Sequence, residues 1–189
     1  MPNWCNNSVS VTHTDPEKLR ALVEAVNAKR FLDFAIPVPQ DLTETVAGFL
    51  GNGDEQKALE LKEQENLKKY GVKNWYDFCV SRWGTKWDVE AYDTVEFDPA
   101  GVTFGFDSAW SPPTGVYEAL VEDGFSVTAF YYEPGMAYAG KWSDEDGDQY
   151  WELSGMTSEQ VRDMLPEDLD EMMCISENMA QWEEENEEN

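Results

Sequence analysis

Alternating polar and apolar positions predict several β-strands along the chain. Ser8-Val9-Ser10-Val11-Thr12 alternates with the two-residue period of a half-buried strand, and Val102, Phe104 and Phe106 share one face of a longer one. Asp146-Gly147 is typical of a hairpin turn. The pattern predicts strands over residues 8–12, 31–35, 87–92, 102–110, 126–132, 137–142 and 149–153.

Helical spacing and capping residues predict the remaining elements. Asp15-Pro16 can open a helix, and Thr157 with Gln160 forms a capping box for the last helical region, which Pro166 divides in two. Gly71 suits the left-handed position after a charged helix. The predicted helices begin near residues 16, 54, 74, 114 and 157.

The order of these elements favours an α+β fold. Without a helical insertion at about residues 40–84 and without the C-terminal region, the order approximates βαββαβ, the split βαβ arrangement. We therefore expect a ferredoxin-like sandwich over residues 1–153, with the helical insertion and an acidic C-terminal hairpin. Residues 154–189 are expected to form an acidic C-terminal helical region and tail.

Charge narrows the classes of function. The 189 residues include 39 acidic and 13 basic side chains, a formal net charge of −26. Residues 141–189 alone contain 17 acidic and 2 basic residues. A phosphate-neutralising nucleic-acid binder needs the opposite balance, and an anionic membrane surface would repel this chain, so we expect neither partner. The densest acidic run, residues 182–189, is expected to be a solvated, frayed end.

Cysteine and histidine usage argues against a cofactor or metal. Cys5, Cys79 and Cys174 are odd in number and widely spaced, and His13 is the single histidine. This predicts reduced thiols in a cytoplasmic protein, without a disulfide framework or a zinc site. The chain has no apolar run of about 20 residues, and its first residues do not resemble a signal peptide. No nucleophile elbow, phosphate-binding loop or dinucleotide fingerprint is present.

Two tryptophan-rich segments are the candidates for a binding face. One is Arg82-Trp83-Gly84-Thr85-Lys86-Trp87, and the other is Phe106-Asp107-Ser108-Ala109-Trp110-Ser111-Pro112-Pro113. Tryptophan beside a cation is enriched at recognition hot spots, which favours contacts through Trp83, Lys86, Trp87 and Trp110. The alternative is that these indoles pack in the core, where large aromatic side chains usually lie.

These segments carry a resemblance to a known family. The opening Met1-Pro2-Asn3-Trp4-Cys5-Asn6-Asn7, the stretches 83–87 and 108–113 and the Tyr132-Glu133-Pro134-Gly135 turn resemble the YubB ferredoxin-like family of phages and conjugative plasmids. The likeness covers roughly residues 1–142. It implies a ferredoxin-like fold, a name that refers to the fold and not to an iron–sulfur cluster, and it assigns no catalytic residue or cofactor.

The charge and the resemblance together predict a non-enzymatic accessory protein of a phage or mobile element. It would bind a host protein with a basic surface, and an anti-defence protein or DNA-mimic inhibitor is the most specific form of this hypothesis. Carboxylates on the last helices approach the charge density of B-DNA, about three charges per 5.4 Å. The acidic residues expected to contact the partner are Asp170, Glu171, Glu183, Glu184 and Glu185.

Two other functions remain open at this point. An enzyme of unknown reaction would have its site near Trp83, Lys86, Asp107 and Trp110. A structural or oligomeric protein would pack the apolar stripe of Leu169, Met172 and Met179 on a partner chain. A pocket with a lysine and a carboxylate would favour the enzyme.

Overall fold

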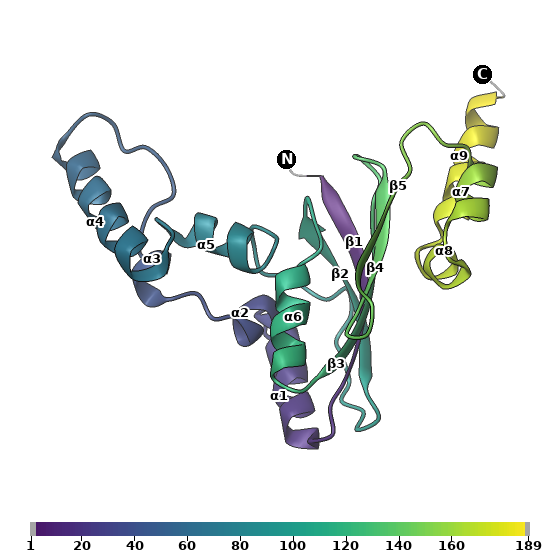
Figure 1. The fold of residues 1–189 in the computed structure, drawn as a ribbon, viewed down its shortest axis with the longest axis horizontal. Helices are drawn as coiled ribbons and strands as arrows, with labels where there is room; N and C mark the ends of the chain where they lie inside the picture. The colour runs from purple at the N-terminus through teal and green to yellow at the C-terminus, as the bar shows by residue number, and fades with distance from the viewer. Residues whose placement is uncertain (1–2, 188–189) are drawn as a thin grey trace.

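The protein is built on one five-stranded antiparallel sheet, shown in Figure 1. The computed structural model describes residues 3–187, with no side-chain description for residue 187. The strand order is β2-β1-β3-β4-β5. The strands are β1 (Trp4–Thr12), β2 (Val102–Ala109), β3 (Ser126–Glu133), β4 (Tyr138–Ser143) and β5 (Gly147–Glu152).

Helices cover both faces of this sheet, so the body is a mixed α+β structure in three layers (Figure 1). The helices before β3 are α1 (Pro16–Asn27), α2 (Phe31–Ala35), α3 (Gln40–Thr43), α4 (Asp54–Tyr70), α5 (Trp75–Arg82) and α6 (Thr114–Glu122). The helices after β5 are α7 (Ser158–Met164), α8 (Glu167–Met173) and α9 (Ile175–Glu187).

The connection from β2 through α6 to β3 sets the centre of the fold. Both strands pair antiparallel with β1 and lie on opposite sides of it, so they are parallel to each other. This is a split βαβ unit. It brings the start of β1 beside the end of β2, because Trp4 pairs with Ala109.

The main hydrophobic core lies between the sheet and helices α1, α2 and α6. Alternate residues of each strand face it, as the two-residue period requires. Val9, Phe106 and Val127 come from three different strands, and Leu22 and Tyr117 come from α1 and α6; all five are buried. Burial of these side chains gives the largest favourable contribution to folding.

The opposite face of the sheet is covered by the C-terminal helices. Leu165, Leu169 and Ile175 are buried in a second apolar cluster that includes Ala139 of β4. Leu169 therefore packs within the protein, while Met172 of the same predicted stripe is 49% exposed. The cluster attaches α7, α8 and α9 to the strands β3 and β4.

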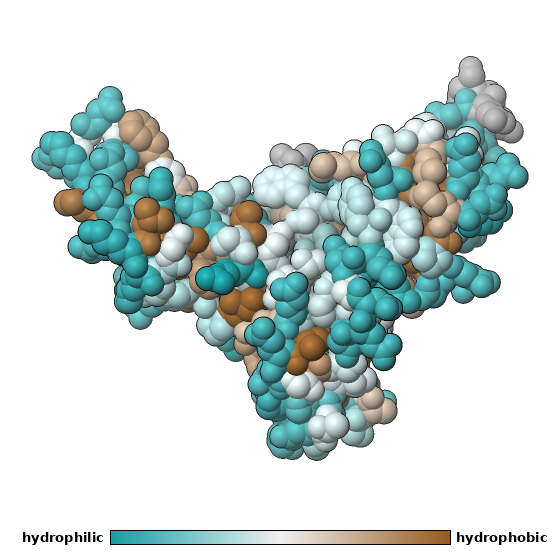
Figure 2. All heavy atoms as spheres, in the orientation of Figure 1, coloured by the Kyte–Doolittle hydropathy of each residue, from teal (hydrophilic) through white to brown (hydrophobic). Residues whose placement is uncertain are grey.

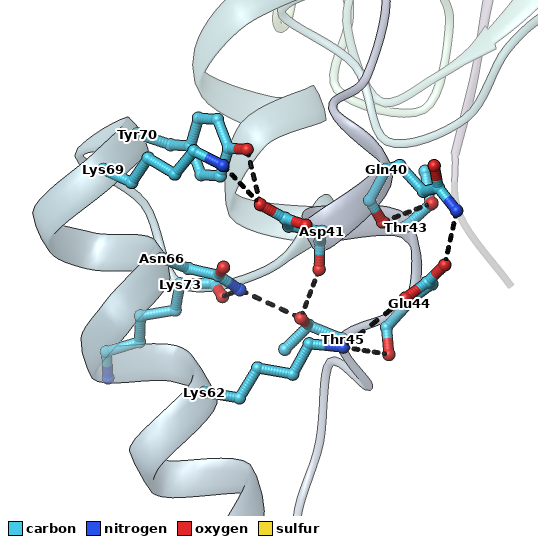
Figure 3. A network of polar contacts seen from close by, with 10 residues as sticks. All are labelled: Gln40, Asp41, Thr43, Glu44, Thr45, Lys62, Asn66, Lys69, Tyr70 and Lys73. Atoms are coloured by element: carbon cyan, nitrogen blue, oxygen red, sulfur yellow. Dashed lines mark hydrogen bonds and ion pairs between the residues drawn. The ribbon is translucent and has the colours of Figure 1, made fainter.

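Helices α3, α4 and α5 form an arm that extends away from the sheet (Figure 1). Figure 3 shows the polar contacts at its base, where Asp41 accepts hydrogen bonds from Lys69 and Tyr70, each at 2.7 Å. Asn66 is buried and donates to Thr45 Oγ1 at 2.9 Å. These contacts hold α4 against the short helix α3.

The strand predicted over residues 31–35 is wrong, because this segment forms the helix α2. The cause lies 55 positions away in sequence: Asp88 Oδ1 and Oδ2 accept the backbone N–H groups of Leu32 and Asp33, each at 2.9 Å. A carboxylate that accepts these first N–H groups stabilises the start of a helix. A local pattern could not reveal that partner.

The strand predicted over residues 87–92 is also wrong. Of this segment, only Ala91 forms a bridge, opposite Phe106 of β2. The Tyr92 N–H donates to the Gly105 carbonyl at 2.9 Å next to it. The Asp88 carboxylate accepts hydrogen bonds from the backbone N–H groups of Val89 and of Leu32 in α2. These contacts hold this segment against α2 instead of along the edge of the sheet.

Most local signals at helix ends are confirmed. Asp15 caps α1, Asn74 caps α5, and Thr157 with Gln160 forms the capping box of α7. Gly71 lies in the left-handed region with φ 77°. Pro166 separates α7 from α8, as predicted.

The frayed end predicted over residues 182–189 is wrong for residues 182–187, which continue helix α9. Glu183 accepts hydrogen bonds from the backbone N–H and the hydroxyl of Ser158, at 2.8 and 2.6 Å. These contacts attach the last turns of α9 to the start of α7. Residues 188 and 189 lie outside the described range.

Candidate functional site

The tryptophan-rich segments meet at one end of the sheet, where β1 begins and β2 ends. The Trp110 N–H donates to the Asn3 carbonyl at 2.9 Å. Thr85 is buried, and its hydroxyl donates to the Ala109 carbonyl at 2.9 Å. The opening segment and the stretches 83–87 and 108–113, which carry the family resemblance, are thus neighbours in the fold. Residues 1 and 2 of the opening are outside the described range.

A chain of hydrogen bonds, buried between Asn7 and Ser108 and partly buried beyond them, fixes these segments. Asn7 Nδ2 donates to Ser108 Oγ at 2.9 Å, and Ser108 Oγ donates to the Ser111 carbonyl at 2.7 Å. The Ser111 hydroxyl donates to the Gly84 carbonyl at 2.5 Å. The Tyr138 hydroxyl, from β4, donates to the Trp110 carbonyl at 2.5 Å. A buried polar network with every member paired specifies one arrangement of the backbone.

Two glycines permit the close approach of the segments. An added Cβ at Gly115 would lie 2.1 Å from the Arg82 carbonyl oxygen. The end of α5 therefore lies directly against the start of α6. Gly84 lies at φ 89°, and a Cβ there would also lie 3.1 Å from the Pro112 carbonyl oxygen. Glycine is the residue that fits both a left-handed conformation and such backbone contact.

Three indoles emerge from this rigid base onto the surface. Trp4, Trp87 and Trp110 are 47%, 41% and 40% exposed. The ring centroids of Trp4 and Trp87 are 6.5 Å apart. Trp110 has a φ of 65°, a strained conformation for a bulky residue. Together with Lys86 we call these residues the tryptophan patch.

Lys86 lies among the aromatic rings of this patch. Its Nζ is 4.2 Å from the centroid of the Trp87 ring, 5.5 Å from that of Tyr76 and 5.9 Å from that of Trp110. Such cation–π contacts stabilise an ammonium group electrostatically. They also hold the lysine stem against the indoles.

Trp83, which the sequence placed with the binding residues, is only 4% exposed. Its Nε1 donates to the Ile36 carbonyl at 2.9 Å, and it belongs to the main core. Its indole therefore supports the patch from below and is not part of the exposed surface. Core packing, the alternative interpretation, is the one that fits this residue.

A pocket of about 300 Å³ opens beside the patch, at the base of the arm. Its walls are mostly apolar, with one lysine and one aspartate. It is lined by Val38, Thr43, Trp75, Cys79, Trp83, Lys86, Trp87 and Asp88. Burial raises the pKa of the Cys79 thiol to about 12, so this thiol is protonated at neutral pH and is a poor nucleophile.

The two carboxylates near the patch have structural partners. Burial raises the pKa of Asp88, while its oxygens accept backbone N–H groups at the start of α2. Asp107 accepts hydrogen bonds from Asn6 Nδ2 at 2.7 Å and from the Tyr92 hydroxyl at 2.5 Å. Within residues 3–187, no hydrogen bond or ion pair joins Asp107 to Lys86, so the structure does not pair these two predicted residues, whereas Asp88 and Lys86 line the same pocket.

The predicted acidic contact residues divide into two groups. Asp170 accepts a 2.7 Å hydrogen bond from the Ser176 N–H at the start of α9, and Glu183 accepts from Ser158 at the start of α7. The Ser158 hydrogen bonds hold the pKa of Glu183 below its usual value. Glu171 and Glu184 are exposed. Glu185 is exposed too, and accepts from the Gln181 side chain at 3.5 Å.

Two general properties of the described chain bear on its chemistry. Among residues 3–187, no group of three or more histidine, cysteine, aspartate or glutamate side chains is arranged to hold a metal ion. No helix in this range has the length and apolar character required to cross a membrane.

Comparison with known proteins places the chain in no established family. No protein-family model and no curated protein matches it. One solved structure with some similarity is the crystal structure of protein api92 from Yersinia pseudotuberculosis, of the family model DUF1281. It is 11% identical, covers 82% of this chain and 99% of its own, and has a TM-score of 0.37. Similarity at this level establishes neither a shared fold nor a shared function.

Sequence reasoning located Lys86, Trp87 and Trp110 but missed two neighbours. Trp4 is the first residue of β1 and precedes the alternating pattern that predicted this strand. It does belong to the opening segment that resembles the YubB family. Tyr76 lies in α5, ten positions before Lys86. The alternation along β1 could have indicated that the Trp4 side chain lies at the end of the strand, but it could not have indicated that Trp87 lies beside it.

Proposed function

We propose that this protein is a non-enzymatic binding protein, an accessory factor of a phage or related mobile element that binds a basic host protein in the bacterial cytoplasm. The observation that carries the proposal is the tryptophan patch: Trp87 and Trp110 lie near Lys86, Trp4 lies beside Trp87, and a network of hydrogen bonds fixes their backbone. Exposed tryptophans on a rigid base are typical of binding hot spots. A surface without a function gains nothing from this arrangement, which keeps apolar area in contact with water.

The charge distribution favours a basic partner. Helices α7, α8 and α9 span residues 158–187, which include 11 acidic residues and one basic residue. The sheet end that carries the patch lies between this unit and the arm (Figure 1), and Figure 2 shows the upper outline of the molecule dipping there. An acidic flank accelerates the association of a basic protein and repels nucleic acid, while the indoles supply apolar contact area.

The fold is consistent with membership of the YubB ferredoxin-like family, which we include in the proposal. A ferredoxin-like sheet would need a further strand outside β2. The segment around Ala91 occupies that position and retains one bridge to Phe106. We propose that this segment is a reduced second strand, so that β1, α1, residue 91, β2, α6 and β3 correspond to βαββαβ. Strands β4 and β5 and the last helices would be additions.

Affinity capture with substituted baits tests the proposed function. The full chain is immobilised and incubated with lysate of a bacterial host, and the captured proteins are identified by mass spectrometry. Trp87→Ala and Trp110→Ala are expected to reduce capture of a specific basic protein at least about tenfold, as hot-spot residues do. Phe49→Ala is the matched control, because Phe49 is 70% exposed but lies between α3 and α4, outside the patch and the acidic unit.

The acidic contribution is tested separately by salt and by charge removal. Replacing Glu171, Glu184 and Glu185 with glutamine is expected to slow association and to weaken its dependence on salt. Asp170 and Glu183 stay unchanged in this variant, because they cap helices. If the patch variants capture the same proteins as the native chain and salt has no effect, the proposal is wrong.

A further inference from the structure

Among the described residues, the lysine of the pocket beside the tryptophan patch, Lys86, forms no ion pair. Among residues 3–187, four basic side chains are half-buried: Lys18, Lys62, Lys86 and Lys141. Three of them pair with a carboxylate, namely with Asp123, Glu44 and Asp168. Lys86 has no such partner in this range, and its ammonium group lies near the rings of Tyr76, Trp87 and Trp110. In a chain with three times as many acidic as basic residues, this is a notable exception.

The acid nearest to Lys86 in the pocket does not balance it. Asp88 lines the same pocket, but its oxygens accept three backbone N–H groups, those of Leu32, Asp33 and Val89, each at 2.9 Å. Its oxygens are therefore occupied by backbone donors, and within the described part of the chain no ion pair joins it to Lys86. Aromatic rings attract the Lys86 ammonium but accept no strong hydrogen bond, so its three N–H donors are available to a ligand.

The other walls of the pocket define the rest of the ligand. Trp75, Trp83 and Trp87 present indole surface, and Val38 and Cys79 present small apolar groups. A volume of about 300 Å³ lies at the lower end of the range for ligand pockets. It accommodates one planar ring system with a short substituent.

We infer that this pocket binds an aromatic ring that carries a single carboxylate, with the ring against the indoles and the carboxylate on Lys86. A monoanion is favoured over a phosphate or a nucleotide because the net charge of −26 opposes each further negative charge on the ligand. The same chemistry has two sources: a free aromatic acid, or the C-terminal aromatic residue of a polypeptide. The inference goes beyond the proposed function, since it requires no basic protein partner.

Matched pairs of ligands test the carboxylate. Indole-3-acetate and phenylacetate are titrated into the full chain by calorimetry and by NMR of the indole N–H signals, beside the neutral amides of the same two acids. We expect each acid to bind about tenfold more tightly than its amide, because a charge-assisted hydrogen bond is lost with the amide. Equal binding of acid and amide, or no binding of either at about 10 mM, would overturn the inference.

Variants assign the effect to the pocket. Lys86→Met is expected to remove the preference for the acid, whereas Lys18→Met, at a half-buried lysine that already has Asp123, should leave it unchanged. Trp75→Leu should weaken acid and amide alike, since it removes ring contact. Near-ultraviolet circular dichroism confirms that each variant is folded. Retention of the full acid preference in Lys86→Met would contradict the assignment.

Two further experiments distinguish the two ligand sources and separate this inference from the proposed function. The peptide Gly-Gly-Phe is compared with its C-terminal amide: tighter binding of the free-acid peptide than of phenylacetate identifies a polypeptide terminus, and the reverse identifies a small acid. Trp110 does not line the pocket. Trp110→Ala should therefore reduce protein capture but leave indole-3-acetate binding within about twofold, so either proposal can fail alone.

Discussion

The arm and the C-terminal unit are both helical additions to the sheet, but they are held by different forces. Helix α4 of the arm is nearly balanced in charge, with five acidic and four basic residues, and buries only Leu59 and Asn66. The unit of α7, α8 and α9 has 11 acidic residues and one basic residue over positions 158–187, yet it packs Leu165, Leu169 and Ile175 against the sheet.

This difference shows that charge balance does not decide how firmly a helix is attached. Apolar burial supplies most of the free energy of association, and exposed ion pairs contribute little. The acidic unit tolerates its charge because it has an apolar cluster, and because Asp170 and Glu183 satisfy backbone N–H groups at helix starts. Helix α4, whose only buried apolar residue is Leu59, depends on polar contacts such as those of Asp41, Asn66 and Thr45.

The largest expected effect is in the C-terminal unit. Leu169→Ala removes a fully buried side chain and should lower the free energy of unfolding by about 2–5 kcal/mol. Leu67→Ala on α4, where the side chain is 49% exposed, should change it by less than about 0.5 kcal/mol. Denaturant unfolding of both variants measures the difference. Equal destabilisation by the two substitutions would remove the basis of the comparison.

A smaller effect is expected where the arm joins the body. Gly115→Ala places a Cβ 2.1 Å from the Arg82 carbonyl oxygen, and the backbone must shift, at a cost of about 1–3 kcal/mol. Gly48→Ala is the control, since nothing lies within 4 Å of its added Cβ. Thermal unfolding reports the cost, and hydrogen exchange shows whether α5 and α6 lose protection. A neutral Gly115→Ala would show that the two helices do not depend on this contact.

Removal of one buried amide should loosen the arm alone. Asn66→Ala breaks hydrogen bonds to Thr45 Oγ1 and to the Lys73 carbonyl and should cost about 1–2 kcal/mol. Hydrogen exchange should accelerate in α3 and α4 and stay unchanged in α7 to α9. The exposed Gln64 on the same helix, changed to alanine, serves as the comparison. Faster exchange in the C-terminal helices would mean that the two units are coupled.

The smallest expected effect is a loss of stability at low pH. Lys69 and Tyr70 hold the pKa of Asp41 below its usual value, and Ser158 does the same for Glu183. A depressed pKa in the folded state means that the stabilisation is complete above the unfolded pKa, near pH 4, and is lost as the pH falls through the folded pKa. NMR titration of the two carboxyl groups should show both midpoints below those of unfolded peptides.

Single substitutions separate the two acid effects. Asp41→Asn should remove the pH dependence of hydrogen exchange in the arm and leave that of α9 unchanged. Glu183→Gln should remove the pH dependence in α9 and leave that of the arm unchanged. The readout is hydrogen exchange in α4 and in α9 between about pH 2.5 and 6. An unshifted titration of either carboxyl group would show that its hydrogen bonds do not persist in solution.

How far the sequence predicted the structure depended on the distance between interacting residues. Asp15, Asn74 and Gly71 act on atoms a few positions away, and each was located correctly from its neighbours. Segment 31–35 was assigned wrongly because its helix starts on Asp88, more than fifty positions later. The segment around Ala91 was also assigned wrongly as a strand, because Asp88 binds the distant helix α2 and only Ala91 forms a bridge to the sheet.

The candidate site shows the same division. The sequence singled out Lys86, Trp87 and Trp110, but Trp4 comes from the start of β1 and Tyr76 from α5. Trp83 was predicted with the exposed residues and is buried under them. Only the pairing of β1 with β2 and the contact of α5 with α6 decide which indoles reach the surface.

By itself, the sequence determined the α+β class, the caps of α1, α4, α5 and α7 and the excess of acid, since composition and near-neighbour contacts decide these properties. The tertiary structure decided which acids cap helices, which tryptophans face solvent and that Lys86 forms no ion pair within residues 3–187. Those properties depend on contacts between residues far apart in the chain, and burial changes the free energy of a charge or a ring in ways that no local pattern encodes.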